Sequence, residues 1–415
     1  MSTADRFHFH TLDNGLRIVT ERMPGIRSAA AGFLARTGSR DEVPELAGVS
    51  HFLEHMCFKG TAKRTWEQIN VDFDRIAADY NAFTSEERTF YYGWVRHEDV
   101  GKQIELLSDM MRSRLPSAEF DMEKKVVLDE IARSKDQLMH VAYDLHHEKV
   151  FADHALSWPI LGHDRTVGAL TRDQMHSYFE ARYAPNNLVL IVAGNVDPAQ
   201  IVEHAAEYCG KWPTGPIGPT RTAPATRAGT AVQQIERFNQ QLIVLSFAAP
   251  SAADPMHETA NAATQILGGA NSRFFWNIVQ TGLSPDASCY RLPYSDCGRL
   301  LLWGQTDPDK CEELAKAMQT EAGRMCTSKV DEHEVQRVKN KRRTSLAVEA
   351  EAPYHRLLQI MDDVDLRGEP RTIEQRLAAV DAVTVDGIAE YFERYSIDRD
   401  GFFLSVGPLD WPPVN

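Results

Sequence analysis

The chain has 415 residues, of which 43% are hydrophobic and 25% are charged, a composition typical of a soluble globular protein. This length is more than one hydrophobic core usually supports, so two or more domains are expected. The formal net charge of −14 disfavours nucleic acid and anionic membranes as partners. The sequence contains no apolar run of about eighteen residues, the minimum for a membrane-spanning helix.

The N-terminal residues and the cysteines favour a cytoplasmic location. The opening residues, MSTADRFHFH, lack a basic head followed by an apolar stretch, so we expect no cleaved targeting peptide. The six cysteines are scattered and form no C-x-x-C pair, which favours reduced thiols.

Strands and helices alternate in the first part of the chain. Asn14-Gly15 between two β-favouring stretches predicts a hairpin. The next predicted elements are a strand at 29–35, a helix at 47–59, a helix at 65–80, a turn-like link at 81–85, a strand at 89–95 and a helix at 97–111. A strong helix then follows at 117–135, with Ser117 as its cap and acidic residues in its first turn.

The helix at 47–59 carries the string His51-Phe52-Leu53-Glu54-His55. On a helix His51 and His55 lie one turn apart on one face, so both imidazoles can reach one metal ion. Glu54 lies on the same side but offset, where a carboxylate can activate a water molecule without being a ligand. The alternative is a buried helix whose histidines bind backbone carbonyl groups. A catalytic zinc site needs a third protein ligand, so that ligand decides between the two.

The helix at 117–135 offers this ligand. Glu123 and Glu130 are two turns apart and therefore lie on nearly one face. Apolar residues at 126–128 indicate burial, and a buried carboxylate must be paired or bound to a metal. Glu130 is the candidate third ligand, with Glu123 as a supporting partner. The alternative is a solvated acidic helix face with interspersed lysines.

The two halves of the chain repeat a pattern. Residues 166–197 and 383–410 both predict a helix, a turn and a buried strand, with identities at one offset, as for Gly194 and Gly407 (407 − 194 = 213). The chain therefore looks duplicated. Residues 214–230, rich in Pro, Gly and Thr, predict a linker between an N-terminal domain at 1–213 and a homologous domain at 231–415. The H-x-x-E-H string does not recur, so the second domain is expected to be non-catalytic.

These features together resemble the pitrilysin and insulysin family of zinc peptidases, the inverzincins. The resemblance is strongest to the two-domain branch, which includes the mitochondrial processing peptidase subunits and bacterial relatives. It covers essentially the whole chain through LDNGLRIV, GVSHFLEHMCFKGT, NAFTSEERTFYY, EKKVVLDEI, APNNLVLIVAGNVD and LGGANSRFF. In the family the ligand glutamate follows the motif by seventy-odd residues and a supporting glutamate precedes it by seven. Glu130 follows His55 by 75 residues (130 − 55) and Glu123 by 7 (130 − 123).

The resemblance implies an α+β fold of two tandem homologous α/β domains, each an antiparallel-rich sheet packed with helices, that form half of a clamshell. It also implies one Zn²⁺ per chain and a division of roles within the site. By this resemblance the zinc ligands are His51, His55 and Glu130, the base is Glu54, and the supporting carboxylate is Glu123.

The implied activity is a zinc metalloendopeptidase that hydrolyses peptides or unfolded segments inside a chamber. Asn81 and Ala82 match the edge segment that receives the substrate as an added β-strand in the family, a mode that main-chain hydrogen bonds support. Glu54 would deprotonate a zinc-bound water that attacks the peptide carbonyl, and would then pass the proton to the leaving amine.

One departure from the family concerns partners. Members with a full substrate apparatus carry an Arg, and a Tyr seven residues later, in the second half, where this chain has Ile278 and Pro285. Arg273 and Tyr290 are nearby but out of register. In the family this pair reaches the site from the far half of the clamshell, which for two-domain chains is another subunit. The resemblance therefore implies a homodimer or a heterodimer, in which a heterodimer partner supplies the Arg and Tyr.

Three functions remain open from the sequence. The first is a zinc endopeptidase, which the complete ligand set and base favour. The second is an inactive or partner-dependent assembly or binding subunit of the same fold, which the missing Arg and Tyr favour. The third is a zinc hydrolase of another substrate class.

Overall fold

The computed structural model describes residues 6–216, 218, 220–328, 330–398 and 401–411. Two β-sheets, each packed with helices, confirm the α+β fold class. The chain divides into two compact units, neither of which is continuous in sequence. Unit 1 comprises Met1–Arg133, Trp158–Arg221 and Val348–Thr372, and unit 2 comprises Ser134–Ser157, Thr222–Ala347 and Ile373–Asn415. Within the described residues, no helix has both the length and the apolar character that crossing a bilayer requires.

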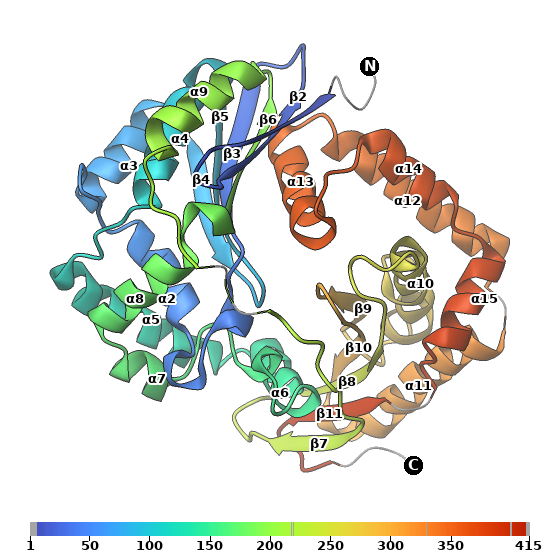
Figure 1. Cartoon of the computed structure of the whole chain (residues 1–415). Coiled ribbons are helices and arrows are strands. Elements are labelled where there is room, and N and C mark those ends of the chain that lie inside the picture. The colour runs from blue at the N-terminus through green and yellow to red at the C-terminus, as the bar shows by residue number, and fades with distance from the viewer. Residues whose placement is uncertain (1–5, 217, 219, 329, 399–400, 412–415) are drawn as a thin grey trace. The chain divides into compact units, whose positions relative to one another are not determined.

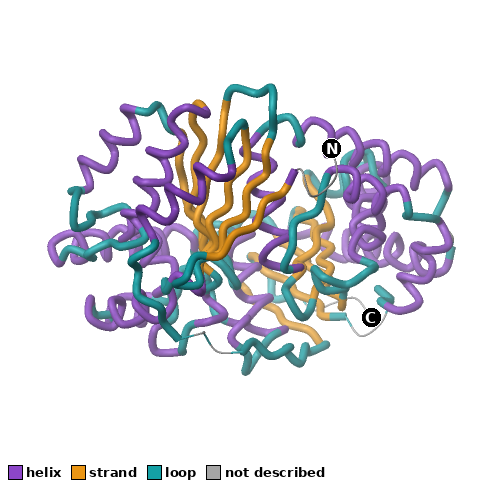
Figure 2. The backbone as a smooth tube through the Cα atoms, turned by 45° about the horizontal axis from the view of Figure 1, so that its top comes forward, coloured by secondary structure: helices purple, strands orange, loops and turns teal. Residues whose placement is uncertain are grey.

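Unit 1 is built on a six-stranded sheet with the order β1-β2-β6-β3-β5-β4, whose strands fan out with a twist in Figure 2. In chain order the strands are β1 (Phe7–Thr11), β2 (Arg17–Arg22), β3 (Ser28–Ala35), β4 (Asp79–Thr84), β5 (Thr89–Arg96) and β6 (Leu188–Gly194). The β2–β6 pair is parallel and the other pairs are antiparallel. Strand β4 lies at one edge of this sheet.

Helices cover both faces of the first sheet. The unit contains α2 (Val49–Cys57), α3 (Trp66–Arg75), α4 (Val100–Met110), α5 (Ser117–Ser134), α7 (Asp164–Ala169), α8 (Arg172–Arg182), α9 (Pro198–Cys209) and α13 (Pro353–Arg367). The larger core packs α2, α4, α5, α8 and α9 on one face. On the other face the apolar side of α13 closes a second core against β3, β5 and β6. Figure 1 shows α13 beside the strands of this sheet.

Unit 2 repeats this plan with a five-stranded sheet of order β7-β11-β8-β10-β9. Its strands are β7 (Gly229–Gln234), β8 (Gln241–Ala248), β9 (Asp286–Pro293), β10 (Gly298–Thr306) and β11 (Phe402–Gly407). Its helices are α6 (Leu138–Val150), α10 (His257–Gly268), α11 (Cys311–Thr327), α12 (Glu332–Glu349), α14 (Ile373–Asp381) and α15 (Val385–Arg394). Helices α10, α11, α12 and α15 pack in the core on one face of the sheet, and α6 packs on the other.

The repeat predicted from the sequence is visible in the strands. Strand β8 begins and ends 213 residues after β3, and the parallel pair β7–β11 matches the parallel pair β2–β6. The helix on the second face is exchanged, because α13 comes from the C-terminal half and α6 from the N-terminal half. The division into 1–213, 214–230 and 231–415 therefore remains a prediction about the sequence repeat, whereas the compact units interleave.

Several predicted elements are confirmed, and one link is wrong. The hairpin at Asn14-Gly15 joins β1 to β2, and the strand predicted at 29–35 is β3. The helix predicted at 65–80 is shorter in the structure, where α3 ends at Arg75. Two residues later Ala77 has a positive φ of 48°, which is not a helical conformation. The turn-like link predicted at 81–85 is instead mostly strand β4, which begins at Asp79. An edge strand with polar residues lacks the continuous apolar run that would have identified it.

Candidate metal centre

A buried carboxylate fixes the start of helix α2. Both oxygens of Glu42 accept backbone hydrogen bonds, from Gly48 N and Ser50 N at 2.7 Å each. Gly48 has a φ of 96°, and a Cβ there would lie 2.7 Å from the Leu161 carbonyl oxygen, so glycine is required. Burial raises the pKa of Glu42 to about 8. Sequence analysis missed this residue because it precedes the helix by seven positions, outside the usual capping window.

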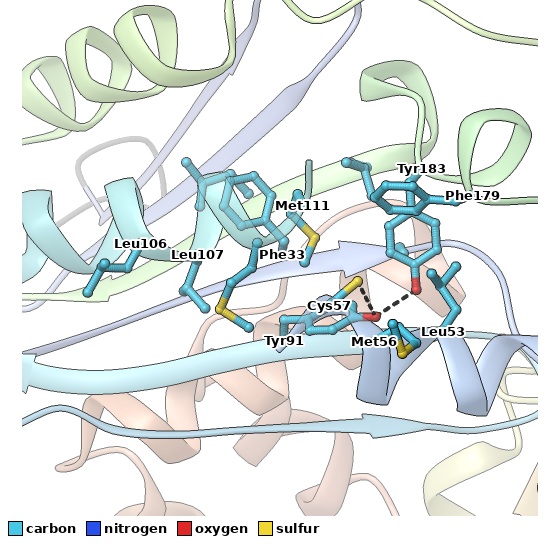
Figure 3. Packing of buried hydrophobic residues seen from close by; sticks show 14 of the residues in the cluster. Phe33, Leu53, Met56, Cys57, Tyr91, Leu106, Leu107, Met111, Phe179 and Tyr183 are labelled. Atoms are coloured by element: carbon cyan, nitrogen blue, oxygen red, sulfur yellow. Dashed lines mark hydrogen bonds between the residues drawn. The ribbon is translucent and has the colours of Figure 1, made fainter. Parts of the chain in front are cut away.

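The underside of α2 is anchored in the main core. Val49, Phe52, Leu53, Met56 and Cys57 are buried, and Figure 3 shows the last three among the packed side chains. The Tyr91 hydroxyl lies 3.4 Å from the Cys57 sulfur and 2.9 Å from the Tyr183 hydroxyl. Burial raises the pKa of the Cys57 thiol to about 12, so this cysteine is a packing residue and not a nucleophile.

Three of the predicted residues meet on the opposite side of this helix. One ligand atom each from His51, His55 and Glu130 lies within 4.8 Å of the others. A Glu130 carboxylate oxygen is 3.8 Å from His51 Nε2 and 3.7 Å from His55 Nε2. Helices α2 and α5 thus bring together residues that are 75 positions apart in the sequence, as the spacing predicted.

Glu123 holds one of the imidazoles in place. His55 Nδ1 donates to a Glu123 carboxylate oxygen at 2.8 Å, and Lys59 Nζ lies 2.6 Å from the other oxygen. Burial opposes ionisation of this carboxyl, but the His55 and Lys59 hydrogen bonds keep the pKa of Glu123 below its ordinary value. With Nδ1 engaged, His55 presents Nε2 toward Glu130, the arrangement that outer-shell carboxylates give to metal-binding histidines.

The two histidines have different electrostatic surroundings. Burial, reinforced by His55, lowers the pKa of His51 to about 3, so this imidazole is neutral at physiological pH. Burial also opposes the charge on His55, but Glu123 and the other carboxylates raise the pKa of His55 above its ordinary value. The carboxylates that favour a positive charge on His55 would also favour a divalent cation bound by the two imidazoles.

Glu54 stands beside this group without belonging to it. Its carboxylate accepts a hydrogen bond from Thr84 Oγ1 at 2.6 Å, and it is half-buried. Burial raises the pKa of Glu54, although the Thr84 hydrogen bond and His55 act in the opposite direction. A carboxyl with a raised pKa next to a metal-type site is suited to take up a proton. Thr84 had no sequence signal, because the strand that carries it was not predicted.

Asn81 and Ala82 lie on β4, outside the ligand group. Asn81 is exposed and its Oδ1 accepts a hydrogen bond from the Ala82 backbone N–H at 2.8 Å. Ala82 is half-buried and contacts the main core. Strand β4 pairs only with β5 among the described strands, so its other edge has no strand partner there.

The donor set fits zinc. Two imidazole nitrogens and one carboxylate oxygen form the three-ligand pattern of catalytic zinc sites, in which a further position stays open for water or substrate. On the His55 side, Glu123 holds the imidazole and is itself bound by Lys59.

Comparisons with known proteins assign the family. Residues 17–164 match the insulinase family, peptidase family M16, and residues 169–342 match the peptidase M16 inactive domain. An uncharacterized zinc protease from Rickettsia felis is 32% identical over 388 residues, which cover 92% of this chain and 93% of the relative. The chain is a member of peptidase family M16. This confirms the resemblance to the two-domain branch of the pitrilysin family, and the metal centre falls within the part that matches the insulinase description.

A further relative and two solved structures are also similar to this chain, the structures in fold. The mitochondrial-processing peptidase subunit beta of Blastocladiella emersonii is 29% identical over 419 residues, covering 97% of this chain and 89% of that protein. A protease from Helicobacter pylori has the same fold, with a TM-score of 0.91 at 20% identity over 97% of this chain and 99% of that one. A structure from Pseudomonas fluorescens, described as a peptidase M16 inactive domain, has a TM-score of 0.89 at 16% identity, covering 97% of this chain and 98% of that one.

The second half of this M16 member offers no replacement for the missing Arg and Tyr at the expected positions. Ile278 is fully buried in the core of unit 2. Arg273, the nearest arginine, forms a bidentate ion pair with Glu334 at 2.9 and 2.7 Å. Tyr290 packs against the α6 side of the sheet, where burial raises its pKa to about 12.

Proposed function

We propose that the chain is a zinc-dependent endopeptidase that hydrolyses peptides or unfolded segments. The observation that carries this proposal is the convergence of His51, His55 and Glu130 from two helices, with Glu54 beside them. The names of the curated relatives, which include several zinc proteases, support zinc as the metal. The cytoplasmic location expected from the sequence is part of this proposal.

The roles follow from the contacts. His51, His55 and Glu130 would hold the zinc, one ion per chain, and Glu123 keeps His55 oriented for it. When bound, zinc supplies a Lewis acid that polarises the peptide carbonyl and makes water more acidic. Glu54 accepts a proton from the water as the water oxygen bonds to the peptide carbonyl carbon, and then delivers that proton to the amine that leaves when the C–N bond breaks.

The β4 edge is the proposed peptide-binding strand. Its free side can pair with an extended peptide through main-chain hydrogen bonds, which hold the substrate and leave side-chain preference to pockets. Asn81 and Ala82 lie on this strand, and α2 packs against it, so a peptide bound there would lie beside the metal centre.

The proposed assembly is a homodimer or a heterodimer. The buried Ile278 and the paired Arg273 support a heterodimer in which the partner supplies an Arg and a Tyr. One relative is named as a subunit of a processing peptidase, which supports the same assembly.

A second candidate function, an inactive or partner-dependent subunit of the same fold, is favoured by the same missing Arg and Tyr. Mixing the chain with a related M16 protein distinguishes the homodimer from the heterodimer. A gain in peptide cleavage on mixing supports the heterodimer, and no gain counts against it.

The test compares the wild type with Glu54→Gln on a mixture of fluorogenic peptides, with zinc content measured in parallel. We expect equal zinc contents and a loss of cleavage of about a hundredfold or more in the variant, because the general base is removed. Glu45→Gln, a change of the same chemistry at an exposed position, is the matched control. Equal cleavage by wild type and Glu54→Gln, or no cleavage by either with or without a partner, would overturn the proposal.

A further inference from the structure

The hydroxyl of Thr84 binds the carboxylate of Glu54 directly. The distance of 2.6 Å from Oγ1 to Oε2 lies in the short range of hydrogen bonds from a hydroxyl to a carboxylate. Among the described residues, Thr84 is the one side chain or backbone group that donates a hydrogen bond to Glu54. Within the described residues, a single hydrogen bond from the protein therefore orients this carboxylate.

Thr84 also belongs to the strand proposed to bind the peptide. It is the last residue of β4, where it pairs with Thr89 of β5. Side chains two residues apart on a strand share a face, so Thr84 and Ala82 both point to the α2 side of the sheet. Two residues of backbone thus connect Ala82, on the proposed peptide-binding edge, to the group that holds Glu54.

We propose that Thr84 is a positioning residue for Glu54, which couples the placement of the peptide-binding strand to the orientation of the base. This inference rests on the proposed peptidase function. Thr84 holds Oε2, which leaves Oε1 as the carboxylate oxygen that faces the reacting water. A peptide that pairs with the free edge of β4 fixes the strand and, through Thr84, the base. Side-chain rotation of Glu54 would otherwise misplace the proton acceptor, and small misplacements cost large factors in rate.

A hydroxyl that only satisfies a half-buried carboxylate would have different consequences. Its loss would lower stability, or substrate binding and turnover together, and the size of the replacing group would matter more than its hydroxyl. A positioning role changes kcat with little change in KM, and any side chain that restores the hydroxyl restores the rate.

The kinetic test compares Thr84→Val, which keeps the shape without the hydroxyl, with Thr84→Ser, which keeps the hydroxyl. We expect Thr84→Val to lower kcat about tenfold or more, with KM and zinc content unchanged, and Thr84→Ser to stay within about threefold of the wild type. Ser85→Ala is the matched control, because that hydroxyl donates to the Arg88 carbonyl in the adjoining turn. A wild-type kcat in Thr84→Val, or an equal loss in Thr84→Ser, would overturn the inference.

A second measurement does not require activity. Crystal structures of the wild type and of Thr84→Val should show the Glu54 carboxylate rotated or spread over several rotamers in the variant, with His51 and His55 unmoved. An unchanged Glu54 side chain in Thr84→Val overturns the positioning role. A wild-type protein that cleaves no peptide would instead overturn the proposed function, while this structural comparison would still decide the role of Thr84.

Discussion

His55 and Glu123 form a partly buried hydrogen bond, 2.8 Å from Nδ1 to the carboxylate, that joins the α2 and α5 helices at the metal centre. Removing the charge of Glu123 should therefore loosen the site without removing a ligand. We expect Glu123→Gln to weaken zinc binding by about 10- to 100-fold, as for other outer-shell partners of metal ligands. Competition with a chromophoric chelator measures the affinity. Asp121→Asn, at an exposed position of the same helix, should leave it unchanged.

Zinc should stabilise the folded chain, since the ligand group is assembled only in the native state. At a free zinc concentration of 100 times the dissociation constant, binding adds about 2.7 kcal/mol to the free energy of unfolding. A thermal melt with and without chelator should show this shift in the wild type and lose it in His51→Ala. His176→Ala, which removes a surface histidine, should retain the shift. A zinc-dependent shift in His51→Ala would contradict the proposed ligand set.

The pH dependence of stability should contain a contribution from Glu42. Burial raises the pKa of this carboxyl from 4.5 to about 8, so the native state keeps a proton that the unfolded chain releases. The stability contributed by this proton is present below about pH 4.5 and is lost as the pH rises toward 8.

Urea unfolding of Glu42→Gln between pH 5 and 8 checks this sign. The variant should show a flatter decline with pH than the wild type, and should be less stable at pH 5 by about 1–2 kcal/mol because an amide accepts only one of the two backbone hydrogen bonds. Glu45→Gln, on the exposed side of the same segment, should follow the wild-type profile. Parallel profiles for Glu42→Gln and wild type would contradict the prediction.

A buried ion pair ties α13 into unit 1. Arg356 Nε lies 2.7 Å from a Glu21 carboxylate oxygen, and both side chains have zero exposure. We expect Arg356→Ala to destabilise the protein by about 1–3 kcal/mol, because it removes one of two arginines from the buried Glu21 and leaves it with Arg6, whose Nε lies 2.6 Å from the other oxygen. Replacing both residues with leucine should cost less than the single change. Arg75→Ala, which breaks an exposed pair with Asp72, should cost less than about 1 kcal/mol in the same denaturation assay.

The metal centre could be predicted from the sequence because its chemistry depends on helical spacing. The positions of His51 and His55 within one helix, and of Glu123 and Glu130 within another, determine which side chains share a face. The repeat at a constant offset predicted two related domains, and the structure has two sheets whose strands keep that offset. The predicted substrate segment at Asn81 and Ala82 lies on an edge strand, but its function remains a proposal.

Other parts of the site have no local sequence signal. Glu42 and Thr84 act through contacts that depend on how distant elements pack, and neither belongs to a periodic pattern. Hydrophobic periodicity also could not predict that α13 packs on the first sheet, because an amphipathic pattern does not specify which of two similar sheets a helix covers. Residues that act through tertiary contacts were therefore missed, whereas residues set by local geometry were found.

The exchange of α6 and α13 has a consequence for any attempt to divide the protein. A proteolytic nick within 214–230 would not release two separable fragments, since each fragment carries a helix that completes the core of the other unit. For the same reason, neither half expressed by itself has all the segments needed to bury its sheet. Because each half supplies a helix to the other unit, deleting either half would remove part of the remaining unit's core and unfold it.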